Sequence, residues 1–154
     1  MDEYRPRTEY AGHAIHLMFA LALVGVGVAF YDSYAIYNGL QLWCPPPIDG
    51  CNTVAYSPYA RILGAPIGYL GLAYYLGMLG LAAGLSREPF SPGLRWVALL
   101  YTAAGLCTSI YFFYVQRTYI KAFCVYCLIS GVVTVLLFLA AIRHFRATRS
   151  GGTR

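Results

Sequence analysis

The sequence predicts an all-α integral membrane protein, a bundle of four transmembrane helices. Hydrophobic residues make up 59% of the 154 residues and charged residues only 11%, whereas a soluble domain is about 25% charged. The charges are also clustered, and they leave four uncharged runs at residues 10–31, 62–86, 96–116 and 122–142. Each run is long enough to cross a bilayer, which takes roughly 20 helical residues.

The four runs give the expected elements in order. We predict helices over approximately residues 13–37, 64–85, 95–116 and 122–143, with an external loop at 38–63. Together they use most of the chain, so residues 1–154 are expected to form a single domain. The first run could be read as a signal peptide, but three acidic residues precede it and no clear small-residue cleavage site follows. We therefore expect no cleavage.

The basic residues predict the orientation of the bundle in a cell membrane. If both termini share one side, that side carries most of the basic residues, and the positive-inside bias makes it cytoplasmic. The loop at 38–63 then faces the external or periplasmic compartment. The net charge of +5 is therefore explained by the orientation of the protein in the lipid membrane, and we expect no nucleic-acid partner. The expected cytoplasmic set is Arg5, Arg7, Arg87, Arg95, Arg143, Arg146, Arg149 and Arg154, and the external set is Arg61, Arg117 and Lys121.

Small residues and tyrosines predict helix packing. Glycines recur at close-packing spacing in "GAPIG" (64–68) and "GLAAG" (80–84), a pattern that lets membrane helices approach each other. The 15 tyrosines are explained by interfacial belts and by packing between helices. Neither set predicts a cofactor site.

Four of the five cysteines fall on the external face of this topology. Cys124 and Cys127 open the fourth helix, and their i, i+3 spacing puts them on one helix face. A helix N-terminus favours an anion and lowers a thiol pKa, and Lys121 could add to this effect at Cys124. The pair is therefore predicted to combine an exchange-ready thiol with a buried one near the membrane. Two packing cysteines are the alternative.

The other pair lies in "CPPPIDGC" (44–51). A disulfide needs Cα atoms within roughly 7 Å, so the segment must fold back, and Asp49-Gly50 favours a turn. Cys44 and Cys51 could form a plain structural disulfide. A second dithiol at the same face favours a relay instead, because disulfides move by thiolate attack. Only one pair has the tight spacing of a zinc site, so we expect no metal. Cys107, in the middle of the third run, is interpreted as a packing residue.

Residues 44–75, "CPPPIDGCNTVAYSPYARILGAPIGYLGLAYY", followed by "FCVYCLIS" at 123–130, resemble the vitamin K epoxide reductase family, specifically its prokaryotic quinone-linked members. The resemblance covers the loop pair, the Ser-Pro-Tyr-Ala at 57–60, the Gly-x-Pro-x3-Leu-Gly entering the second helix, and the Cys-x-x-Cys. It implies a thiol–quinone oxidoreductase that drives disulfide formation in exported proteins and reduces ubiquinone or menaquinone. The thioredoxin-like domain fused to many bacterial members is absent, so a separate thioredoxin-fold, DsbA-like carrier is the implied partner.

The resemblance also implies a role for each site residue. Cys44 would exchange with the dithiol of the carrier, and Cys51 would form a transient disulfide with Cys124. Cys127 would face the quinone and transfer electrons to it. Ser57 would support a thiolate or a quinone oxygen, and residues 58–63 would cap the bundle as a half-helix.

Two positions depart from the vertebrate enzymes of the family. Ile67 and Gly131 stand where those enzymes have an asparagine and a tyrosine that bind the quinone oxygens. The departures argue against epoxide reduction. Quinone reduction needs only the thiols and a pocket, so it remains the expected activity.

Four other polar or aromatic residues suggest different roles. Asp32 could supply protons for quinol formation, since intramembrane charges mark functional sites, or it could reach headgroup water. His13 and His16 are expected to be interfacial, far from the thiols. Trp43 is an expected interfacial anchor, and its place before Cys44 is similar to claudin-type adhesion proteins.

Two rival functions follow from these observations. A structural, claudin-like four-helix protein predicts one stable loop disulfide but leaves the Cys-x-x-Cys without a role. A DsbB-like oxidase would carry the Cys-x-x-Cys in the first external loop and the separated pair in the second. The order is reversed here.

Overall fold

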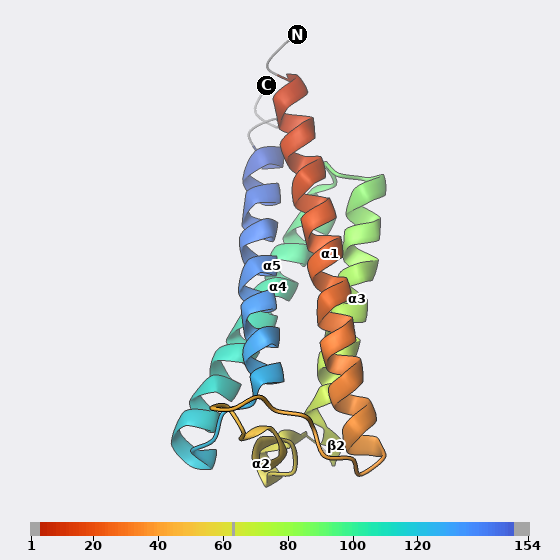
Figure 1. Ribbon diagram of the computed structural model, residues 1–154. Helices are drawn as coiled ribbons and strands as arrows, with labels where there is room; N and C mark the ends of the chain where they lie inside the picture. Colours follow the sequence, from red (N-terminus) through yellow and green to blue (C-terminus); the bar gives the residue numbers. More distant parts are fainter. Residues whose placement is uncertain (1–3, 63, 150–154) are drawn as a thin grey trace.

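The computed structural model describes residues 4–62 and 64–149, and within them it confirms the predicted all-α membrane bundle (Figure 1). Four helices are long and apolar enough to cross a membrane, with spans at Glu9–Tyr37, Ile67–Arg87, Pro92–Ile120 and Val125–Arg149. The corresponding helices are α1 (Tyr4–Tyr37), α3 (Ile67–Arg87), α4 (Pro92–Val115) and α5 (Val125–Arg149). The chain is therefore a multi-pass membrane protein.

The helices form an elongated bundle with the two ends of the chain at the same end (Figure 1). The long loop between α1 and α3 lies at the opposite end. Helix α1 packs along α3 and α5, and α4 packs along α5, whereas α3 and α4 make few contacts. In Figure 1 these two helices lie together near the chain termini and diverge toward the loop end. A cavity lies between them, lined by side chains of both helices, among them Leu70, Tyr74, Ala104 and Ile110.

Large side chains on α3 and α5 fill the centre of the bundle, opposite small ones. Tyr75, Met78 and Leu137 are almost completely buried. The Tyr75 ring lies directly against Gly25 of α1, and the Tyr74 ring lies against Gly105 of α4. Aromatic rings can occupy these places only because the facing residue has no side chain.

The predicted glycine pairs pack differently from what the spacing suggested. Gly68 lies against Asp32 and Ser33, and Gly84 lies against Leu94. Gly64 and Gly80 have no neighbour within 4 Å of the place where a Cβ would stand. Gly68 therefore makes a close approach to α1, but most of the other close approaches are made by single glycines outside these motifs, Gly25, Gly77 and Gly105, each of which faces a tyrosine.

The loop between α1 and α3 begins with a regular helix end. Gly39 adopts φ +64°, and the N–H groups of Gly39 and Leu40 donate to Ile36 O and Ala35 O at 3.2 and 2.9 Å. This is the Schellman arrangement, in which glycine supplies the left-handed conformation without a Cβ clash. It turns the chain back across the end of the bundle.

The predicted half-helix at 58–63 is wrong in position and length. The loop contains a short helix α2 (Cys51–Ala55) and a single 3-10 turn η1 (Pro58–Ala60). It then forms two short strands, β1 (Arg61–Ile62) and β2 (Ala65–Pro66), paired antiparallel. Leu63 lies outside the described residues. The α-helix in this loop begins earlier, at Cys51. Pro58 can only start a turn, and Arg61 and Ile62 are extended, so residues 58–62 form no α-helix.

The junction between the third and fourth spans also differs from the prediction. Residues 117–121 were expected to form a brief connection, but α4 continues into a π-helical turn, η2 (Gln116–Ile120). Lys121 ends this turn in the left-handed region at φ 56°. Helix α5 begins only at Val125, so Cys124 precedes the helix and only Cys127 lies within it.

Candidate redox site

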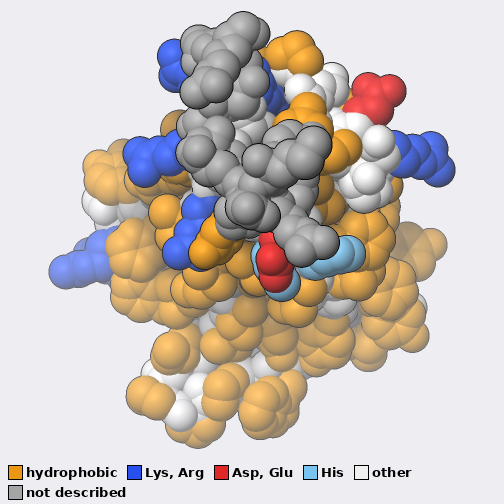
Figure 2. All heavy atoms as spheres, turned by 90° about the horizontal axis from the view of Figure 1, so that it is seen from above, with side chains coloured by type: hydrophobic (Ala, Val, Ile, Leu, Met, Phe, Trp, Pro, Cys, Tyr) orange, Lys and Arg blue, Asp and Glu red, His pale blue; other side chains and the backbone are white. Residues whose placement is uncertain are grey.

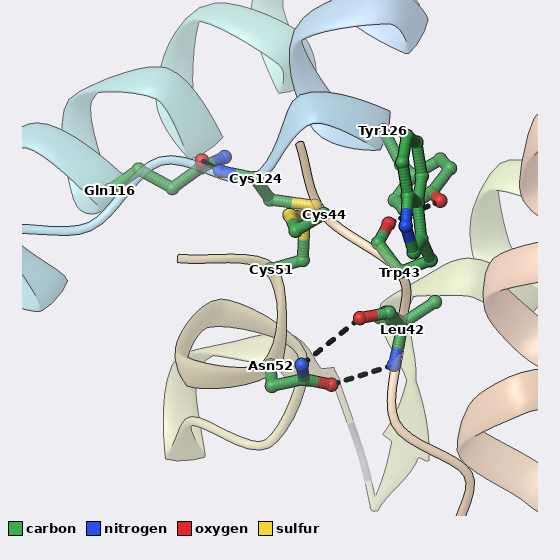
Figure 3. The surroundings of a disulfide bond; sticks show 8 residues. All are labelled: Leu42, Trp43, Cys44, Cys51, Asn52, Gln116, Cys124 and Tyr126. Carbon is green, nitrogen blue, oxygen red and sulfur yellow. Dashed lines mark hydrogen bonds between the residues drawn. A yellow bond between two sulfur atoms is a disulfide. The ribbon is translucent and has the colours of Figure 1, made fainter. Parts of the chain in front are cut away.

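The loop cysteines form a disulfide at the end of the bundle (Figure 3). Cys44 and Cys51 have Cα atoms 6.1 Å apart, within the range that a disulfide requires. Cys51 opens α2 and is fully buried, whereas Cys44 is half-buried. The bridge is therefore accessible from outside mainly at Cys44.

Two side chains, Asn52 and Tyr126, hold the segment that carries Cys44 by hydrogen bonds to its backbone. The Asn52 side chain accepts from Leu42 N–H at 2.8 Å and donates to Leu42 O at 3.1 Å, which ties this segment to α2. The Tyr126 hydroxyl donates to Trp43 O at 2.6 Å and ties it to α5. The peptide units on either side of Trp43 are thus fixed to the two elements that carry the other cysteines (Figure 3).

Cys124 lies beneath this disulfide. In Figure 3 its sulfur points toward the Cys44–Cys51 bridge, and the residue is buried. The Cys124 N–H donates to Gln116 Oε1 at 2.9 Å, and the Cys124 carbonyl accepts from Leu128 N–H at 3.0 Å. Cys124 is therefore the capping residue of α5, where the helix dipole favours a negative charge.

The two thiols of the Cys-x-x-Cys pair differ electrostatically. A hydrogen bond from the Cys127 thiol is the main cause that lowers the pKa of Cys124, and burial acts in the opposite direction. Lys121 is not among the causes, contrary to the expectation from sequence. The Gln116 side chain also contacts Cys127. A thiolate at Cys124 is thus favoured by its partner cysteine, which makes Cys124 a good leaving group in exchange with the loop cysteines beside it.

Cys127 lies on the wall of a large cavity between the helices. The cavity has a volume of about 790 Å³, within the range of small-molecule sites. Its walls are almost entirely apolar, and some of the lining side chains, such as Leu70, Ile110 and Val132, are also exposed on the lipid-facing surface. Ile67 and Gly131, the two departures from the vertebrate pattern, line the cavity as well. Its size, apolar walls and thiol fit a lipid-soluble quinone.

The remaining predicted residues lie elsewhere. The Ser57 hydroxyl donates to Val54 O at 2.8 Å, and Ser57 does not line the cavity. Cys107 is exposed on α4. His13 is exposed and lies 3.8 Å from Glu9, on the half of α1 nearer the chain termini. This position agrees with the prediction that His13 lies far from the thiols.

Sequence reasoning missed Gln116, Asn52 and Tyr126. Gln116 follows an aromatic-rich apolar run and is buried. A single uncharged polar residue at the end of such a run gives a weak signal, because most of these residues reach headgroup water. The contacts of Asn52 and Tyr126 with residues 42 and 43 depend on how the loop folds back.

Fold and site together define a multi-pass membrane protein that brings two cysteine pairs together at one end of a helical bundle. The sequence profile of the Vitamin K epoxide reductase family matches residues 16–142. The chain belongs to this family, whose members are oxidoreductases that use redox cysteines and quinones and generally work with thioredoxin-like partners.

Proposed function

We propose that the protein oxidises the dithiol of a thioredoxin-fold, DsbA-like carrier and reduces a membrane quinone, ubiquinone or menaquinone, thereby driving disulfide formation in exported proteins. The observation that carries the proposal is the place of the Cys-x-x-Cys pair. Cys124 points at the loop disulfide, and Cys127 lines the apolar cavity. The pair thus contacts both the loop disulfide and the cavity that suits a quinone.

The chemistry of the thiols follows from their surroundings. A thiolate of the carrier would attack the half-buried Cys44, and the second carrier thiol would complete its reduction, leaving Cys44 and Cys51 as thiols. Cys51 would then attack an oxidised Cys124–Cys127 pair at Cys124, and Cys44 would resolve the mixed disulfide by attacking Cys51. Each exchange forms one S–S bond and breaks one, so two electrons pass inward and the loop disulfide is restored.

The cavity beside Cys127 would hold the final electron acceptor, a quinone. A bound quinone takes up two electrons and two protons when it becomes a quinol. Cys127 would hold its reduced thiol at the cavity wall, and Gln116 would keep the two cysteines of the pair oriented by binding Cys124 N–H and contacting Cys127. Ser57 would support the loop, because its hydroxyl donates to Val54 O rather than to the thiolate or quinone oxygen that the resemblance implies.

We also propose the orientation and extent of this unit. Residues 1–154 act as one domain, with both termini cytoplasmic and the disulfide on the external face. Figure 2, seen from the end where the termini lie, shows Lys and Arg side chains around that end of a largely hydrophobic surface. Arg87, Arg143, Arg146 and Arg149 are exposed, as the positive-inside bias requires for a cytoplasmic face. Arg154 lies outside the described residues.

The test is quinone reduction by the purified protein, with a reduced thioredoxin-fold carrier as electron donor. We expect wild type to turn over and both Cys44→Ala and Cys127→Ala to stop. With a small-molecule dithiol in place of the carrier, Cys44→Ala should regain quinone reduction and Cys127→Ala should not. No turnover by wild type with either quinone, while Cys44–Cys51 stays bridged, would contradict the proposal and leave a structural role for the disulfide.

A further inference from the structure

One acidic side chain shares the cavity with Cys127. Asp32 lies near the loop end of α1 and is the only charged residue among the described residues that line the cavity. Within the part of the chain that the structure describes, its carboxyl makes neither an ion pair nor a hydrogen bond. Charged groups inside a membrane bundle are costly and mark functional positions. Packing alone therefore does not explain why an acidic residue stands at position 32.

The neighbouring elements leave room for this carboxyl. A Cβ on Gly68 of α3 would stand 2.7 Å from Asp32 Oδ2, so the side chain fits only because Gly68 has none. The other titratable groups that face Asp32 are Cys124, Cys127 and Tyr126, all in or beside the start of α5. The groups that interact with Asp32 include no cation, so a neutral, protonated carboxyl is the less costly form in this apolar cavity.

Asp32 also acts electrostatically on Cys124. Its charge raises the pKa of Cys124, against the larger lowering by Cys127. Protonation of Asp32 and ionisation of Cys124 are therefore linked, because removing the charge from one favours the charge on the other. A proton that leaves Cys124 has a nearby acceptor, the Asp32 carboxyl, which lines the cavity beside Cys127.

We propose, resting on the proposed function, that Asp32 holds the proton released by Cys124 and delivers it to the quinone when the Cys-x-x-Cys pair is oxidised. Two electrons come from the Cys124 and Cys127 sulfurs as the S–S bond between them forms. One proton comes from the Cys127 thiol and the second from the Asp32 carboxyl, which is left as a carboxylate. The quinone gains two electrons and two protons and becomes a quinol, so atoms and charge balance.

The first experiment measures reduction of a short-chain ubiquinone analogue by dithiothreitol-reduced protein over a range of pH. Positioned general acids contribute roughly 100-fold or more to such steps. We expect Asp32→Asn to slow quinone reduction by about this factor and to change the pH dependence of the rate, while Asp32→Glu retains most of the rate. Glu88→Gln, which changes an exposed carboxyl in the turn between α3 and α4, is the matched control and should behave as wild type.

The second experiment has no quinone in it. The rate of alkylation of Cys124 is followed against pH, with the Cys44–Cys51 bridge intact. Asp32→Asn should shift this profile to lower pH, because the variant lacks the negative charge that Asp32 carries once both groups have lost their protons. Glu88→Gln should leave the profile in place. Formation of the loop disulfide in the Asp32→Asn variant shows that the variant is folded.

The outcomes separate this proposal from the proposed function. If wild type does not reduce the quinone, the proposed function fails, and the alkylation profile still tests the link between Asp32 and Cys124. If wild type turns over and Asp32→Asn keeps both the rate and the pH profile, the role of Asp32 is overturned. The same conclusion holds if Asp32→Glu is as slow as Asp32→Asn and the alkylation profile of Cys124 does not move.

Discussion

Cys124 and Cys127 are three residues apart, yet the structure gives them different surroundings. Cys124 caps α5 beneath the loop disulfide and accepts a hydrogen bond from the Cys127 thiol, which lowers its pKa. Cys127 lies a turn deeper, on the cavity wall. The first cysteine is thereby suited to exchange with the loop cysteines, leaving as a thiolate when Cys44 resolves the mixed disulfide, and the second is placed next to a ligand dissolved in the membrane.

This difference predicts how the reactivity of Cys124 depends on pH. Cys127→Ala removes the donor that stabilises the Cys124 thiolate, so the pKa of Cys124 should rise and its alkylation should begin at higher pH than in wild type. Cys127→Ser keeps a hydroxyl donor and should give a profile closer to wild type. The measurement is the rate of iodoacetamide labelling of Cys124 against pH. Identical profiles for the alanine and serine variants would contradict the assigned cause.

Individual site residues could be predicted only where the residue type itself performs the chemistry, as cysteine does. All four cysteines at the loop end were identified from spacing and topology. Gln116 and Asn52 could not be, because each acts through a hydrogen bond to a residue distant in sequence, Cys124 or Leu42. Asp32 was noticed as a charge in an apolar run, but only the cavity shows that it shares a space with Cys127.

At the scale of elements, the packing of α1 on α3 depends on a glycine and a tyrosine. Gly25→Ala would place a Cβ against the buried Tyr75 ring, whose hydroxyl lies 2.7 Å from Ser130 Oγ. Overpacking of this kind costs about 1–3 kcal/mol, so we expect a clear drop in the melting temperature of the detergent-solubilised protein. Gly27→Ala lies on the same helix with no neighbour within 4 Å and should leave it unchanged or slightly higher. Equal effects of the two variants would refute this account.

The loop that carries Cys44 makes a second prediction at this scale. Asn52→Ala removes both hydrogen bonds to Leu42 and leaves buried peptide groups unpaired, at a cost of about 1–3 kcal/mol. The segment should loosen, and dithiothreitol should reduce the Cys44–Cys51 disulfide faster, by at least about fivefold, the factor that corresponds to 1 kcal/mol at the lower end of this range.

The control for this prediction lies beside Asn52 in the same helix. Thr53 is exposed, so Thr53→Ala should be reduced at the wild-type rate. The reaction is followed by trapping free thiols at intervals and separating the labelled forms. A wild-type rate for Asn52→Ala would show that the two bonds do not restrain the disulfide.

The existence of the helices was predictable, but their ends were less so. The uncharged runs located all four spans, since a membrane helix must be apolar over its length. Charge does not end a helix, however, so α1 and α5 extend beyond the apolar runs, to Tyr4 and Arg149. The π-helical turn η2 and the late start of α5 at Val125 depend on the left-handed conformation of Lys121, which side-chain type does not predict.

At the scale of the whole molecule, the two ends of the bundle carry different chemical groups. The loop end holds the disulfide, the Cys-x-x-Cys pair and the wider part of the bundle, and the other end holds the chain termini and exposed arginines (Figures 1 and 2). An oxidising compartment is needed for the loop disulfide to persist, while the basic end favours the cytoplasm. Both requirements are met by only one of the two possible orientations.

This orientation is testable with reporters of opposite preference. Alkaline phosphatase is active only outside the cytoplasm. Green fluorescent protein does not fluoresce when it is exported through the general secretion route, so its fluorescence reports the cytoplasm. Phosphatase inserted after Pro47, in the exposed part of the loop, should be active, and the same enzyme fused after residue 149 should be inactive. Fluorescent protein should give the reverse pattern. Replacing Arg143, Arg146 and Arg149 together by glutamine should weaken the bias without touching the thiols, because orientation follows the distribution of Lys and Arg near the helix ends. An active phosphatase at residue 149 of the unaltered chain would place the disulfide in the cytoplasm. Such a result would remove the external thioredoxin-fold carrier from the proposed function.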